Sequence, residues 1–227
     1  MRRSSEKKVE TDNVDSRDVR IPPRDLPGTL NIPNNAFALV VFAHGSGSSR
    51  LSPRNVAVAD ALNRSGMATL LFDLLHPEEE PVRNRANVFD ISLLSDRLAE
   101  AIRWIDGNPS LKKLPIGLFG ASTGAAAALV AAAHLGNRIG AVVSRGGRPD
   151  MAGDALPNVH APTLLIVGGA DYGVIELNED AFKRLNYPKT MEIVPGATHL
   201  FPEPGAMDKV IALASRWFDH HLRATPI

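Results

Sequence analysis

Apolar runs and segments with helical spacing alternate along most of the chain. Runs typical of strands buried on both faces of a sheet occupy residues 37–45, 68–75, 115–120, 139–144 and 163–169. Parallel neighbouring strands need a crossover between them, and that crossover is usually a helix. The alternation therefore predicts an α/β fold with a mostly parallel central sheet and helices on both faces.

Helix-boundary residues and 3.6-residue spacing indicate where the crossovers lie. Ser52 is expected to act as N-cap, with Pro53 in the first helical position. The expected helices span residues 52–66, 91–107, 123–136, 176–185 and 205–222. One more strand is expected at 191–195, between the last two helices.

The N-terminal region has a different character. Residues 1–17 carry mixed charges and few apolar groups, which predicts a polar arm. Residues 19–22 and 26–33 indicate two short strands that form an edge hairpin. Residues 18–227 are then expected to form a single domain. No insertion between strands exceeds about 20 residues, so a separate lid domain is not expected.

Composition narrows the classes of function. The formal net charge is +0 at pH 7, so no overall field attracts nucleic acid or an anionic membrane. The chain has 0 cysteines, which excludes disulfides, thiolate metal sites and a cysteine nucleophile. It shows neither a secretory signal nor an apolar run long enough to span a membrane. A cytoplasmic location is expected, with no metal and no cofactor.

The strongest chemical motif lies where residues 115–120 meet the helix expected at 123–136. Residues 120–124 read GASTG and fit the pattern G-x-S-x-G. A tight strand-to-helix turn lifts the serine hydroxyl above the sheet, beside the positive end of a helix. Glycines on both sides avoid steric collisions in this turn. Ser122 is therefore the candidate nucleophile.

An acid and a histidine should follow the nucleophile in that order. Asp171 follows the strand expected at 163–169, and His199 follows the strand expected at 191–195. Catalytic groups in open α/β sheets gather at the carboxyl ends of the strands. His199 is expected to act as general base, with Asp171 as the acid that orients it. Asp150 is the alternative acid.

The loop after the first buried strand is the second part of the expected site. Attack on an ester carbonyl creates an oxyanion that requires hydrogen-bond donors. The backbone N–H of Thr123, directly after the nucleophile, is one expected donor. The backbone N–H of Ser46, in the loop 44–47, is the other. His44 in the same loop is a candidate substrate contact.

Two arginines form a further candidate site. Arg145 and Arg148 follow the strand 139–144 in a glycine-rich loop at the same sheet edge. They are expected either to contact an anionic group of the substrate or to lie on a solvated surface. Arg50 and Arg54 flank the start of the first helix and could add to such a patch, but a surface position is favoured for both.

These motifs together resemble those of the α/β-hydrolase superfamily. HGSGSS, GASTG, the aspartate of GGAD and the histidine of GATH follow in the order of that superfamily. The lid-free layout is similar to its dienelactone hydrolase-like branch, from about residue 37 to the end. The resemblance implies the same nucleophile, acid, base and oxyanion donors. Dienelactone hydrolases proper use a cysteine nucleophile where this chain has Ser122, so their lactone specificity is not carried over.

The expected activity is hydrolysis of a small-molecule carboxylic ester or related acyl bond through an acyl-enzyme. Two alternatives stay open at this point. Acyl transfer could use the same three groups, with an alcohol or amine in place of water. A hydrolase-fold protein could also use the site only to bind a ligand. The sequence leaves open the acyl group, the alcohol and the oligomeric state.

Overall fold

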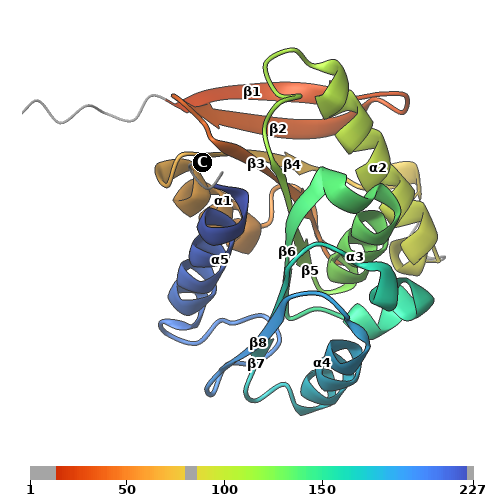
Figure 1. Cartoon of the computed structure of the whole chain (residues 1–227), viewed down its shortest axis with the longest axis vertical. Helices are drawn as coiled ribbons and strands as arrows, with labels where there is room; N and C mark the ends of the chain where they lie inside the picture. Colours follow the sequence, from red (N-terminus) through yellow and green to blue (C-terminus); the bar gives the residue numbers. More distant parts are fainter. Residues whose placement is uncertain (1–13, 80–85, 224–227) are drawn as a thin grey trace, which may run out of the picture.

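A single twisted sheet forms the centre of the molecule (Figure 1). The computed structural model describes residues 14–79 and 86–223. Over these residues the strand order is β1-β2-β4-β3-β5-β6-β7-β8. The strands are β1 (Val14–Ile21), β2 (Leu26–Pro33), β3 (Ala38–Ala43), β4 (Met67–Phe72), β5 (Ile116–Ala121), β6 (Ile139–Arg145), β7 (Thr163–Gly168) and β8 (Lys189–Val194). All neighbours from β4 to β8 pair in parallel, which confirms the mostly parallel sheet.

Helices cover both faces of this sheet (Figure 1). They are α1 (Pro53–Arg64), α2 (Ile91–Gly107), α3 (Thr123–Leu135), α4 (Tyr172–Arg184) and α5 (Ala206–Leu222). One apolar cluster joins α1 and α5 to the sheet, through residues such as Val58 and Phe218. A second cluster joins α2 and α3 to the opposite face, through residues such as Leu98 and Ala128. In the described part of the chain no separate lid domain is present.

The edge hairpin is present, but it begins earlier than expected. β1 pairs antiparallel with β2, from Val14 opposite Pro33 to Ile21 opposite Leu26, and β2 pairs antiparallel with β4. Residues 14–17 of the expected arm are therefore part of a strand. Pairing with β2 gives their backbone groups hydrogen-bond partners although their side chains are mostly exposed. Residues 1–13 lie outside the described part of the chain.

Two element boundaries differ from the expected ones close to the candidate site. β4 ends at Phe72, because Asp73 turns away and its carboxylate binds the backbone N–H and guanidinium of Arg50 at 2.7 and 2.8 Å. α4 begins at Tyr172, four residues before the expected start at 176. Asp171 therefore sits directly at the N-terminus of a helix.

Candidate active site

The expected chemical groups converge on one edge of the sheet. Ser122 lies between β5 and α3, and Asp171 follows β7. His199 lies in the loop after β8, and Ser46 in the loop after β3. Arg145 is the last residue of β6. All five positions lie at carboxyl ends of parallel strands, where ligands collect in open α/β sheets.

Ser122 occupies a strained turn. Its backbone has φ 51° and ψ −123°, a conformation that non-glycine residues rarely adopt. Its carbonyl oxygen accepts hydrogen bonds from the N–H groups of Ala125 and Arg148, both at 3.1 Å. A Cβ atom at Gly124 would lie 2.2 Å from the carbonyl oxygen of Ala43, so the second glycine of the motif is needed for close packing. These contacts hold the serine at the start of α3.

His199 is oriented by Asp171. The Nδ1 atom of His199 lies 2.7 Å from Oδ2 of Asp171, in a partly buried contact. Asp171 is the N-cap residue of α4, yet its side chain makes no cap hydrogen bond. Its carboxylate is directed to the imidazole instead, which leaves the other ring nitrogen available as a proton acceptor. The carboxylate of Asp150 binds Arg148 at 2.9 and 2.8 Å, so the alternative acid is paired elsewhere.

Ser122 and His199 line the same cavity, which has a volume of about 290 Å³. The two side chains make no direct hydrogen bond to each other in the described structure. Such contacts are often long or poorly aligned before substrate binds. The lining residues are Gly45, Ser46, Gly47, Ser48, Ser52, Arg54, Asn55, Ala121, Ser122, Arg145, His199 and Leu200. The cavity therefore brings together the expected nucleophile, the expected base and one of the expected arginines.

The loop that carries Ser46 lies against the nucleophile. A Cβ atom at Gly45 would lie 2.9 Å from Cβ of Ser122, so a side chain there would displace one of them. The backbone N–H of Ser46 donates to Oγ1 of Thr123 at 3.0 Å. This N–H therefore reaches an oxyanion only if the Thr123 hydroxyl shares or gives up the bond. Thr123 itself is buried as the first residue of α3.

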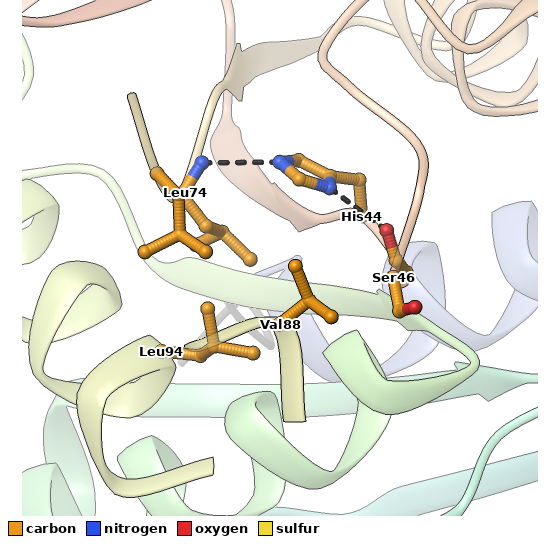
Figure 2. Close-up of a pocket in the computed structure, with 7 residues that line it drawn as sticks. His44, Ser46, Leu74, Val88 and Leu94 are labelled. Atoms are coloured by element: carbon orange, nitrogen blue, oxygen red, sulfur yellow. Dashed lines mark hydrogen bonds between the residues drawn. The ribbon is translucent and has the colours of Figure 1, made fainter. Parts of the chain in front are cut away.

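The main chain holds the ring of His44 through both of its nitrogens. Its Nε2 accepts a hydrogen bond from the N–H of Leu74 at 3.0 Å, which leaves Nδ1 to donate to the carbonyl of Gly45 at 3.1 Å (Figure 2). His44 lines a small apolar cavity with Leu74, Val88 and Leu94. It also lines a larger cavity of about 330 Å³, which shares Ser48 with the cavity of Ser122. Its ring fixes the loop after β3, and the substrate contact expected of His44 stays a prediction.

Arg145 extends into the cavity from the end of β6. It is 4% exposed, and its Nη2 donates to Oδ1 of the buried Asn55 at 3.2 Å. Its guanidinium carbon lies 5.9 Å from the ring centroid of Phe201. Burial, with a smaller contribution from the charge of Arg54, lowers the pKa of Arg145 to about 10. The group therefore remains a cation at neutral pH.

Arg148 is not among the residues that line this cavity, which fits the second of the two alternatives expected for it, a solvated surface position. Its guanidinium makes a two-pronged ion pair with Asp150, two residues away, and this hydrogen bond raises the pKa of Arg148. Arg54, expected on the surface, lines the cavity instead. Sequence reasoning named Arg54 as an addition to the arginine patch but favoured a surface position for it, and it missed Asn55. The available signal was their position in the first turn of the helix that follows the HGSGSS loop.

The described residues offer no metal centre and no spanning helix. Across residues 14–79 and 86–223, no three histidine, aspartate or glutamate side chains are grouped so that they could hold a metal ion. Within the same residues, no helix is both long and apolar enough to cross a membrane.

Comparison with known families identifies the relatives of this site. The family model described as the dienelactone hydrolase family matches residues 26–221. The chain belongs to the dienelactone hydrolase family. A crystal structure of a dienelactone hydrolase from Anabaena variabilis is similar over 93% of this chain and 99% of that chain, with a TM-score of 0.88 and 54% identity. Membership of this family supports a hydrolase, and hence an enzyme.

Two further relatives help to define what the family assignment covers. Est1E from Butyrivibrio proteoclasticus has a TM-score of 0.73 at 17% identity, over 92% of this chain and 99% of that chain, and shares the fold. A Mycobacterium tuberculosis protein named "Putative phosphoribosyl transferase" is 57% identical over 200 residues, which are 88% of this chain and 45% of that protein. The chain thus spans about half the length of that curated relative.

Proposed function

We propose that this member of the dienelactone hydrolase family is a serine hydrolase that cleaves a carboxylic ester or related acyl bond. Ser122 is the nucleophile, His199 the general base and Asp171 the acid that orients it. The main support for this proposal is the 2.7 Å contact between Nδ1 of His199 and Oδ2 of Asp171, beside the cavity that Ser122 lines. This pairing fixes the tautomer in which the second imidazole nitrogen can accept a proton.

The first half of the reaction forms the acyl-enzyme. Nε2 of His199 accepts the hydroxyl proton as Oγ of Ser122 bonds to the carbonyl carbon. The carbonyl oxygen becomes an oxyanion that accepts hydrogen bonds from backbone N–H groups. Thr123 supplies one of these groups at the positive end of α3, and Ser46 supplies another once Oγ1 of Thr123 yields its bond. The oxyanion then collapses, and the alcohol leaves with the proton held by His199.

The second half repeats the cycle with water. His199 takes a proton from a water molecule, and the hydroxide oxygen bonds to the acyl carbon. Collapse of the second oxyanion breaks the bond to Oγ of Ser122, which recovers its proton from His199. The products are a carboxylic acid and the free enzyme, and no external oxidant or reductant is needed.

Labelling with a fluorophosphonate tests the nucleophile directly. The wild-type protein should be labelled, and peptide mapping should place the adduct on Ser122. Ser122→Ala should abolish labelling and lower kcat on a chromogenic ester by about 10³-fold or more. Circular dichroism serves as the folding control. Wild-type-like turnover by a folded Ser122→Ala protein would rule out this mechanism.

The name of the M. tuberculosis relative is not carried over to this chain. Only 45% of that protein matches, so its phosphoribosyl transferase name can refer to the other part. Acyl transfer on the same three groups is tested in the same assay by adding alcohols or amines. Ester products in place of the free acid would assign a transferase.

A further inference from the structure

Among the described residues, two arginines in the cavity beside Ser122 have no acidic partner. In the described chain, six arginines are shielded from solvent, and four of them have a carboxylate within 4.0 Å, namely Arg50, Arg97, Arg138 and Arg148. The remaining two are Arg54 and Arg145, and both line the same cavity. Unpaired cations are therefore gathered where a substrate would bind.

The position of Arg145 is fixed while part of its hydrogen-bonding capacity is unused. Nη2 is held by Asn55, and the guanidinium lies near the ring of Phe201. Its Nε is buried without an acceptor, as is Nε of Arg54. Nε of Arg50 and Arg97 is in the same state, but these two arginines have a carboxylate partner and the cavity arginines have none among the described residues. Buried guanidinium donors without acceptors are costly, because they lose hydrogen bonds to water and gain none. An arrangement of this kind is expected where a ligand supplies the missing acceptors.

The surroundings of the two arginines add further donors. α1 begins at Pro53, and its N-cap residue Ser52 makes no side-chain cap hydrogen bond. Ser52 is 7% exposed and lines the cavity together with Ser48. The N-terminus of a 12-residue helix carries a partial positive charge and favours anions. Cations, hydroxyl groups and a helix N-terminus therefore lie around one cavity.

We propose that this end of the cavity binds a doubly charged phosphoryl group of the substrate, held between Arg54 and Arg145 and remote from the bond that Ser122 cleaves. The inference rests on the proposed function and specifies its substrate class. A phosphoryl group carries a charge of about −1.5 to −2 near neutral pH and three strong acceptor oxygens. It can neutralise both guanidinium groups and accept from the hydroxyl groups as well. A single carboxylate has one charge and two oxygens, so it would leave one cation unpaired.

Binding to a catalytically inactive protein tests this inference apart from turnover. Calorimetry on Ser122→Ala would compare phenyl phosphate, benzoate and benzyl alcohol. Phenyl phosphate should bind tightest. Charge-assisted hydrogen bonds predict that adding Arg54→Gln or Arg145→Gln weakens its binding about 10- to 150-fold. Arg148→Gln is the matched control, since its guanidinium is paired outside the cavity, and it should leave the affinity unchanged.

Several outcomes of this binding experiment would contradict the proposed phosphoryl site. Equal affinity for phenyl phosphate and benzyl alcohol, or tighter binding of benzoate, would overturn the proposal. Equal effects of Arg54→Gln and Arg148→Gln would also overturn it. Arg54 is only partly buried and Arg145→Lys keeps the charge, so the test does not depend on one buried substitution. Fluorophosphonate labelling of Ser122 and hydrolysis of a neutral ester report separately on the proposed function.

Discussion

Replacing Arg145 by methionine should separate function from stability. Methionine keeps a flexible apolar stem of similar length but removes the buried charge. If the guanidinium serves to bind the substrate, its burial destabilises the free folded protein, because no carboxylate of the described chain offsets the loss of hydration. Arg145→Met should therefore weaken phosphate binding while leaving the free energy of unfolding unchanged or higher.

The magnitude follows from the environment of Arg145. A fall in its pKa from the ordinary arginine value to about 10 corresponds to about 3 kcal/mol of disfavoured charge in the folded state. Removing the side chain also leaves Oδ1 of buried Asn55 without its partner, at a cost of about 1–3 kcal/mol. The two effects nearly cancel, and a gain in stability of about 0–2 kcal/mol is expected at neutral pH.

The pH dependence of this effect has a definite sign. The folded-state pKa lies below the unfolded value, so both states hold the charge below pH 10 and the penalty is fully present there. The penalty decreases only above about pH 10, as the folded state releases its proton. The stability difference between wild type and Arg145→Met should therefore stay constant from pH 6 to 9.

Urea unfolding provides the assay, and Arg97→Met provides the control. Arg97 is 2% exposed, comparable with Arg145, but it is paired with Glu79 and lies 3.7 Å from Glu100. Removing a partner from a buried ion pair is expected to cost about 3–5 kcal/mol. If Arg145→Met lost as much stability as Arg97→Met, the guanidinium would be structural, and its proposed role in substrate binding would lose its main support.

Two further predictions concern the proton-transfer groups. Asp171→Asn should lower kcat by about 10⁴-fold, as expected when the acid that orients a catalytic histidine is neutralised, whereas Asp150→Asn should change kcat little. Steady-state kinetics that showed the reverse ranking would reassign the acid. The logarithm of kcat/KM should rise with pH from acid conditions to neutrality, because only neutral His199 can accept the serine proton. A rate that is highest at pH 4–5 would exclude a histidine base.

The fold was largely predictable because its strands are buried on both faces. Five continuous apolar runs can bury the side chains of both strand faces only inside a sheet that helices cover on both sides. β3 to β7 lie at those runs. β1 was different, since most of its side chains are exposed and its pairing comes from the backbone. Residues 14–17 therefore carry no apolar pattern, and their hydrogen-bonded partners are fixed only by the tertiary structure.

In the candidate site, too, some residues follow from the strand pattern and others depend on tertiary contacts. Ser122, Asp171 and His199 could be placed from the sequence because their positions follow from strand order and the common carboxyl edge. Arg145 could be placed at this edge for the same reason, as the last residue of β6. Arg148 and Arg54 could not be placed, because the direction of a long side chain depends on which acceptors are within reach. Arg148 has a carboxylate two residues away and pairs with it. Arg54 reaches the cavity because the first turn of α1 lines it together with the end of β5, although the two segments are far apart in sequence.

One residue links the proposed nucleophile to the proposed phosphoryl site. The backbone carbonyl of Arg145 accepts a hydrogen bond from the N–H of Ser122 at 3.3 Å, while its side chain enters the cavity. β5 and β6 are paired in parallel up to these residues, with Ala121 opposite Arg145. The distance between the reacting hydroxyl and the guanidinium is thus set by sheet geometry rather than by a mobile loop. A substrate anchored at its anionic end would present its ester at a fixed height above Ser122, so binding energy at Arg145 would contribute to orientation as well as to affinity.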